Sequence, residues 1–258
     1  IQANKHIFVE KPAVDNLKAA RNIYNLLKKN KKIYFNSNYI LQKYPKFIYL
    51  KKLIIKKKLG KIYYFEGDYN YGRLSKLTSG WRGKIPFYSV SNGGGIHIVD
   101  LSSFLIDDKI VEVKSFSNKF TTHKTSFKYP DCVVTIAKFR SGIIGKFTSN
   151  FGCVYPHFHK VAIYGTKKTF ESTASNTTLF YKRDKKVGVK LKFNNKIDKG
   201  LILKDFVNSI MLKKNRKKFI YEVFNSLSIC FAIDKSYKEN RNIKIKYFKW
   251  KFLSQNLC

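Results

Sequence analysis

The chain has 258 residues and a mass of 30.2 kDa, enough for one large domain or for one domain with part of another. Hydrophobic residues make up 44% of the sequence, so it can bury a core, which argues against a disordered protein. The longest stretch without Lys, Arg, Asp or Glu covers residues 85–99. It is too short and too rich in Gly, Ser and Asn to span a bilayer, so no membrane protein is expected.

The start of the chain and its cysteines indicate the compartment. Residues 1–12, IQANKHIFVEKP, contain no signal-peptide core, and the first residue is Ile1, consistent with a chain that begins in mid-protein. The four cysteines show neither a CxxC pair nor regular spacing, so neither a zinc site nor a disulfide framework is predicted. A reducing, cytoplasmic location fits this pattern.

The charge is strongly positive, with 52 Lys and Arg against 16 Asp and Glu, a net charge of +36. Specific nucleic-acid recognition favours arginine, whereas nearly all of these cations are lysines spread along the chain. The short lysine runs also fall at expected helix ends, where solvent and the helix dipole favour them. A nucleic-acid or acidic-lipid surface therefore remains only an alternative.

In chain order, the sequence first predicts a strand–helix–strand unit. Residues 5–10 are apolar enough for a short buried strand, and residues 16–29 have apolar side chains at helical spacing after Asp15, the expected cap. A second strand begins at Ile33. This βαβ pattern indicates the end of a parallel sheet.

The remaining elements predict a mostly antiparallel sheet with helices, so the fold class is α/β followed by α+β. Alternating apolar residues in 132–139 are typical of a strand that is buried on one face. The other expected strands are 61–71, 110–116, 143–151, 158–164, 187–193 and 243–247, and the expected helices are 45–58, 95–105, 203–212 and 222–237.

Lys11 is the first candidate functional residue. It follows the first strand in the sequence Glu10-Lys11-Pro12. The carboxyl ends of parallel strands border the crevice in which α/β sheets bind ligands, so Lys11 is placed to meet one. The alternative is an ordinary surface lysine, which is common in so basic a chain.

His97 and Asp100 follow three glycines in the segment Gly93–Asp100. Glycines let the backbone approach a ligand closely, and His97 and Asp100 share a helix face. Histidine exchanges protons near neutral pH, so His97 is a candidate acid or base. The alternative is a capped helix with a packed histidine. The glycines do not form a G-x-G-x-x-G dinucleotide fingerprint, because position 98 is Ile.

A second histidine pair, His157 and His159, is expected on one face of a strand. No carboxylate or cysteine stands at an obvious partner spacing, so substrate contact or a structural role is favoured and no metal site is predicted.

Taken together, these segments resemble the Gfo/Idh/MocA family of NAD(P)-dependent sugar and polyol dehydrogenases, over almost the whole chain and in the family's order. The family fold is a Rossmann domain followed by an α/β domain with an open, mostly antiparallel sheet. The matching segments are VEKP at 9–12, Gly60-Lys61-Ile62, Gly67-Asp68-Tyr69, Gly80-Trp81-Arg82-Gly83, 93–100, Tyr164-Gly165-Thr166 and Asp205-Phe206.

The resemblance implies that residues 1–40 are the end of the dinucleotide-binding domain and residues 41–258 the substrate-binding and oligomerisation domain. About 90–100 residues with the phosphate-binding βαβ would be absent, roughly the size of that half-domain. The chain would then be an N-terminally truncated form, and the residue that discriminates NAD from NADP would lie outside it.

The resemblance also assigns roles to individual residues. Lys11 and His97 are the implied catalytic pair, and many family members carry an Asp at the position that is Gly93 here. Lys11, His97, Asp100 and His157 are the implied substrate-binding residues, with Asp100 able to orient His97. The implied NAD or NADP contacts are Glu10, Lys11, Asn38, Trp81 and Arg82, with Asn36 near the same segment.

The leading hypothesis is therefore a dehydrogenase that acts on a sugar, polyol or nucleotide sugar, and that forms a homo-oligomer. Two alternatives remain open. The chain could be an inactive module that oligomerises through its open sheet, although Lys138 and Lys146 on a shared face would favour solvent. It could also be a basic nucleic-acid-binding protein, which no motif supports.

Overall fold

The computed structural model describes residues 1, 3–183, 188–194, 197–198 and 200–249. At the N-terminus, β1 (Ile7–Val9) and β2 (Phe35–Ser37) pair in parallel and are joined by α1 (Leu17–Lys29), which confirms the predicted βαβ unit. The side chain of Asn16 rather than Asp15 caps α1, since its Oδ1 accepts a hydrogen bond from the Ala19 amide.

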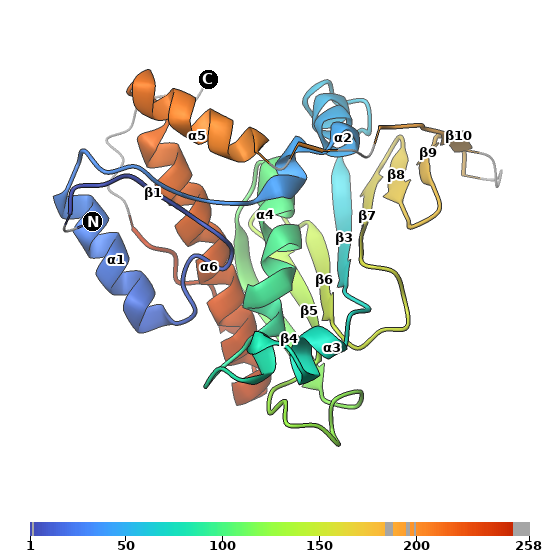
Figure 1. The fold of residues 1–258 in the computed structure, drawn as a ribbon. Coiled ribbons are helices and arrows are strands. Elements are labelled where there is room, and N and C mark those ends of the chain that lie inside the picture. The colour runs from blue at the N-terminus through green and yellow to red at the C-terminus, as the bar shows by residue number, and fades with distance from the viewer. Residues whose placement is uncertain (2, 184–187, 195–196, 199, 250–258) are drawn as a thin grey trace.

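A nine-stranded sheet forms the larger layer of the molecule (Figure 1). Among the strands that the structure describes, only β3 and β6 pair in parallel, so the sheet is mostly antiparallel as predicted. Its spatial order is β10 (Gly188–Lys190), β9 (Thr177–Phe180), β8 (Thr169–Ser172), β7 (Phe158–Gly165), β3 (Ile62–Asn70), β6 (Ile144–Asn150), β5 (Cys132–Phe139), β4 (Ile110–Asn118) and β11 (Ile243–Lys244).

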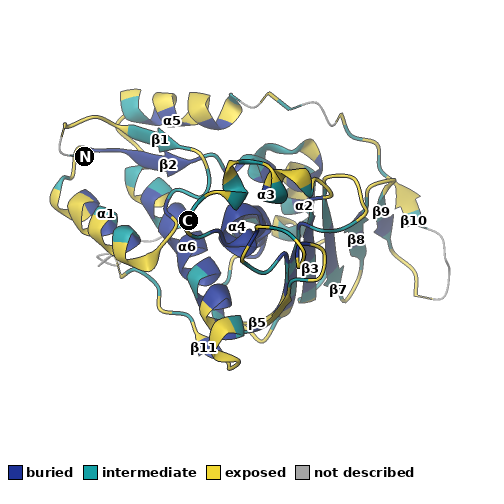
Figure 2. Ribbon diagram, turned by 60° about the horizontal axis from the view of Figure 1, so that its bottom comes forward, coloured by how far each residue is buried: buried dark blue, intermediate teal, exposed yellow. Residues whose placement is uncertain are grey.

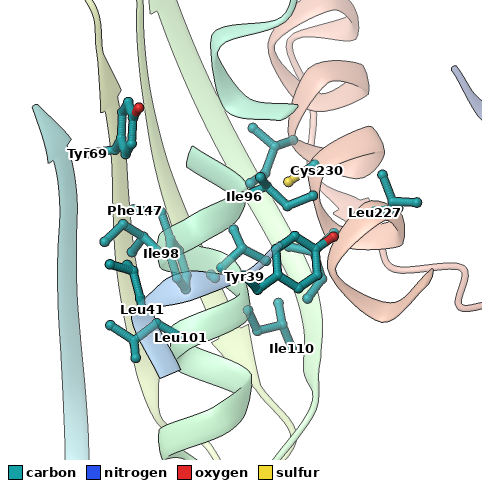
Figure 3. Packing of buried hydrophobic residues seen from close by; sticks show 14 of the residues in the cluster. Tyr39, Leu41, Tyr69, Ile96, Ile98, Leu101, Ile110, Phe147, Leu227 and Cys230 are labelled. Carbon is teal, nitrogen blue, oxygen red and sulfur yellow. The ribbon is translucent and has the colours of Figure 1, made fainter. Parts of the chain in front are cut away.

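Two helices connect this sheet to the N-terminal unit. Helix α4 (Ile96–Leu105) packs on β3, and α6 (Arg216–Glu239) contacts α4, β4 and β2. Both are buried along much of their length, whereas α1 exposes its outer face (Figure 2). In Figure 3, Tyr69 and Phe147 from the sheet approach α4 from one side, and Leu227 and Cys230 of α6 approach it from the other. This core holds the first turn of α4 in place.

The remaining helices lie at the edges. Helix α2 (Pro45–Ile55) ends three residues before the predicted boundary, α3 (Ser75–Thr78) is a single turn, and α5 (Leu201–Met211) brings Phe206 against Phe8 of β1. None of the described helices has the length and apolarity needed to cross a bilayer. The predicted domain boundary near residue 40 stays a prediction.

No helix of the described residues covers the face of the large sheet opposite α4 (Figure 1). Ion pairs cross its central strands: Lys146 Nζ lies 2.6 Å from Glu66 Oε1 and 3.0 Å from Asp68 Oδ1. Exposed apolar side chains, among them Phe116 and Ile136, flank these pairs. The Lys146 charge that was expected to meet solvent is therefore partnered within the sheet.

Candidate functional site

Lys11 lies directly after β1, at the carboxyl end of the parallel pair, as the sequence predicts. Its ammonium donates a hydrogen bond to the carbonyl oxygen of Gly93, 2.5 Å away, in the turn that precedes α4. Burial, followed by the nearby Arg82 charge, lowers the pKa of Lys11 to about 8, with Glu10 acting in the opposite direction. Lys11 is therefore a mostly buried amine that is hydrogen-bonded to the turn before α4. It is not the ordinary surface lysine of the alternative interpretation.

The glycines before α4 let this turn pack closely against the rest of the protein, and their approach to a ligand stays a prediction. A Cβ at Gly93 would lie 2.2 Å from the Tyr88 hydroxyl. At Gly94 it would lie 2.5 Å from the Tyr69 ring, and at Gly95 it would lie 2.0 Å from Ser149 Oγ. The wide π-helical turn Ser91–Gly95 can reach the sheet this closely only without side chains.

His97 is on the first turn of α4 and is only 8% exposed. Its ring stacks near Tyr69, with centroids 6.1 Å apart, and its buried Nδ1 atom has no hydrogen-bond partner among the described residues. Burial, and then the charges of Lys11, His159 and His157, lower the pKa of His97 well below its ordinary value. The imidazole is therefore neutral near pH 7 and can accept a proton.

His157 and His159 lie side by side, with ring centroids 5.1 Å apart. His159 stands opposite Tyr69 in the β3–β7 register, and its ring is 5.8 Å from that of His97. Burial lowers the pKa of His157 to about 4, with Arg73 as the next cause, and that of His159 to about 3, with His157 as the next cause. Strand pairing and the packing of α4 on β3 thus bring all three histidines around Tyr69.

The implied cofactor contacts lie at the same end of the parallel pair. Asn38 donates a hydrogen bond of 2.9 Å to the Glu10 carboxylate, so the segments after β2 and β1 are tied together. Arg82 lies with its guanidinium carbon 4.7 Å from the centroid of the Trp81 ring, and its Nε donates to the Tyr88 hydroxyl at 3.1 Å. Trp81 is 58% exposed and offers an accessible aromatic face.

Asp100 is placed away from this cluster. It is 2% exposed and accepts hydrogen bonds of 3.1 and 3.0 Å from Gln42, while no hydrogen bond joins it to His97 within the described residues. Burial raises the pKa of Asp100 well above its ordinary value. The orienting role of Asp100 toward His97 therefore stays a prediction.

Several side chains around the three histidines were not predicted from the sequence as site residues. Tyr69 is at the centre of this cluster, and Tyr71, Tyr88 and Arg73 surround it, since the Tyr71 ring is 4.8 Å from His157 and the Arg73 guanidinium is 5.5 Å from Tyr71. Residues on β3 alternate between the two faces, but periodicity alone does not say which strand pairs with β3. Only the segment Gly67-Asp68-Tyr69 in the family resemblance signalled Tyr69.

Metal-binding groups and cavities are two further features of the described residues that bear on the position of this site. The described residues contain no group of three or more His, Cys, Asp or Glu that could hold a metal ion. A cavity of about 540 Å³ lies toward the other end of α4, beside Phe104, and is lined by Asn36, Tyr39 and Glu222 among others. We assign the site from the convergence of titratable side chains rather than from that cavity.

The lowered histidine pKa values predict acid sensitivity. Unfolding restores the ordinary pKa of 6.5, so below that pH the unfolded chain binds more protons, and stability falls as the pH drops toward 4. We expect the urea midpoint of His159→Gln to fall less than that of wild type over this range. Replacement of the exposed His123 by Gln serves as the control. Equal slopes for His159→Gln and wild type would contradict the assignment.

Comparison with known proteins finds a similar domain and similar folds. Residues 47–171 match the model of the GFO/IDH/MocA C-terminal domain. A search of curated protein sequences found no match. Levoglucosan dehydrogenase in complex with NADH has a TM-score of 0.83 at 16% identity, with 96% of this chain and 75% of that chain covered.

Two further solved structures have the same fold. The complex of levoglucosan dehydrogenase with NADH and levoglucosan has a TM-score of 0.83 at 17% identity, covering 96% of this chain and 76% of that chain. The myo-inositol 2-dehydrogenase from Lactobacillus plantarum has a TM-score of 0.77 at 15% identity, covering 93% and 74%. The match to the GFO/IDH/MocA C-terminal domain covers residues 47–171, and these solved dehydrogenase structures share the fold over nearly the whole chain.

Proposed function

We propose that this chain carries the catalytic site of an NAD(P)-dependent dehydrogenase that oxidises or reduces a sugar or polyol. The observation that carries the proposal is the junction of Lys11 with the turn before His97, which links the end of a parallel strand to a buried, neutral imidazole. The similarity to structures described as levoglucosan and myo-inositol dehydrogenases supports this class of substrate.

The residues present fit the nicotinamide end of such a cofactor. Glu10, Lys11, Asn38, Trp81 and Arg82 gather near the carboxyl ends of β1 and β2, where α/β sheets bind ligands. The printed sequence contains no G-x-G-x-x-G segment, so pyrophosphate contacts of that type would have to come from outside this chain. When bound, the nicotinamide supplies the hydride acceptor or donor.

His97 and Lys11 would handle the proton of the reacting hydroxyl group. A neutral His97 ring can accept that proton, and no hydrogen-bond partner within the described part of the chain competes for its Nδ1. Lys11, with a pKa of about 8, can polarise the same oxygen while charged and can pass a proton to solvent when it deprotonates. The Tyr69 ring lies beside both groups, 5.9 Å from Lys11 Nζ and 6.1 Å from the His97 ring, measured to the ring centroids.

A turnover screen tests this proposal. The protein expressed from its complete reading frame is incubated with NAD⁺ or NADP⁺ and a panel of neutral sugars, polyols, sugar acids and nucleotide sugars. We expect the absorbance of reduced nicotinamide to rise with at least one substrate. If the protein binds the cofactor but reduces neither NAD⁺ nor NADP⁺ with any substrate of the panel, the proposed dehydrogenase activity is contradicted.

We also propose that the protein forms a homo-oligomer through the open face of the large sheet. Phe116 is 62% exposed and Ile136 is 47% exposed on neighbouring strands, and burial of such side chains favours association. Sedimentation should give a dimer or higher oligomer at micromolar concentration, and Ile136→Asp should shift it toward monomer. A wild-type monomer would contradict the proposal.

A further inference from the structure

The cluster around Tyr69 is cationic, with almost no compensating negative charge. Burial raises the pKa of Tyr69, and the charges of Arg82 and Arg73 act on it in the opposite direction. Lys11 Nζ lies 5.9 Å from the centroid of the same ring. After burial, the charge of Lys11 is among the causes that lower the pKa of each of the three histidines. Groups of one sign that converge on one place repel each other, so an arrangement of this kind is stable only with a counter-charge or at a cost in folding free energy.

The acidic residues near this cluster form their contacts outside it. Among the described carboxylates, only Glu10 affects the pKa of Lys11, and none affects the pKa of His97, His157 or His159. Glu10 is itself exposed and hydrogen-bonded to Asn38. Asp68 precedes Tyr69 directly, but it lies on the opposite side of β3, where it pairs with Lys146.

The turn before α4 also excludes a carboxylate from the centre of the cluster. Position 93 is glycine, and the Tyr88 phenol occupies the space that any side chain there would enter. The Tyr88 hydroxyl accepts a hydrogen bond from Arg82, so this space holds a neutral acceptor for a cation. Neither Arg73 nor Arg82 forms an ion pair with a described acidic residue.

Two buried polar atoms in the cluster are also unpartnered. Nδ1 of His97 and Nε2 of His159 are buried and have no hydrogen-bond partner among the described residues. Because buried polar atoms are nearly always hydrogen-bonded in folded proteins, these two indicate that a polar ligand completes the site. The arginines at the rim and the histidines inside would then contact different parts of that ligand.

We infer that the substrate is an anionic sugar, in which a carboxylate or phosphate group lies among Arg73, Arg82 and Lys11 while a hydroxyl group reaches His97. Guanidinium groups bind both kinds of oxyanion through paired hydrogen bonds, and the missing internal carboxylate leaves that position to the ligand. This inference rests on the proposed function, because it describes the substrate of the same site.

Calorimetric titration without turnover tests it. Glucose, glucuronate, glucose 6-phosphate and UDP-glucose are titrated into the complete protein with its nicotinamide cofactor at one fixed ionic strength. We expect at least one of the three anions to bind ten times more tightly than glucose. Preference for glucuronate would indicate a carboxylate, and preference for the other two would indicate a phosphate.

Variants separate this site from the general positive charge of the chain. Arg82→Gln and Arg73→Gln should each weaken binding of the preferred anion by about tenfold, the scale of one charge-assisted hydrogen bond. Arg21→Gln removes the same charge from the exposed side of α1 and should leave the affinity unchanged. Equal affinities for glucose and all anions, absent binding, or equal losses in all three variants would overturn the inference.

The result is distinguishable from a failure of the proposed function. Nicotinamide reduction with neutral sugars, together with no preference for anions in the titration, would overturn only the anionic substrate. Tight and arginine-dependent anion binding, with no reduction of nicotinamide by any substrate, would support the anion site and contradict the dehydrogenase.

Discussion

Replacement of Lys11 by alanine is expected to lower kcat by about a hundredfold or more in the complete protein, the low end for a group that moves a proton. Lys11 Nζ is the cation held against the turn before α4, and no other lysine bonds to that turn in the described residues. Its pKa of about 8 means that loss of its charge should appear in the pH dependence of turnover near that value. Steady-state rates across pH would measure both effects.

Lys5→Ala provides a matched control, because Lys5 is an exposed lysine on the same N-terminal segment. Its turnover should equal that of wild type. The urea midpoint of Lys11→Ala should not fall substantially, since the substitution removes a desolvated charge. A Lys11→Ala variant that turns over like wild type would remove Lys11 from the chemistry.

His97→Ala is expected to lower kcat by about a hundredfold or more as well, because it removes the one buried ring that faces both Tyr69 and His159 from α4. The double variant with Lys11→Ala should lose less than the product of the single losses, since the two groups act on the same proton. Initial rates of the single and double variants measure this coupling.

His123→Ala is the control for loss of a histidine, since His123 is exposed in the loop between β4 and β5. Circular dichroism and the urea midpoint show whether His97→Ala keeps the fold. A folded His97→Ala variant with undiminished turnover, or single losses that multiply in the double variant, would contradict a shared role.

Local patterns predicted the elements that depend on neighbouring residues. The helix after Asn16 and the alternation in β5 follow from spacing along the chain, and both lie where the sequence places them. The strands β8 and β9 were not predicted, because each has only four residues, two of them Thr or Ser, which is too short for a clear apolar alternation. Strand 187–193 proved shorter, with β10 at Gly188–Lys190 and its predicted first residue outside the described residues.

The site depended on contacts between distant segments, which local patterns do not determine. Lys11 and Gly93 are 82 residues apart, and Tyr69 meets His159 only because β3 pairs with β7. Likewise, α6 begins at Arg216, inside a basic run that was expected to be a solvated helix end. The Arg216 guanidinium donates instead to the carbonyl oxygens of Leu27, Asn30 and Ile33, and so fastens α6 to the βαβ unit.

The most direct test of the central claim is to follow the transferred hydrogen. A substrate that reduces nicotinamide in the turnover screen is prepared with deuterium on its reacting carbon, and the reduced cofactor is analysed by mass spectrometry and NMR. The account predicts one deuterium at nicotinamide C4, formed at least a hundredfold more slowly by Lys11→Ala and His97→Ala. Reduced cofactor without deuterium, or transfer at the wild-type rate in both variants, would contradict it.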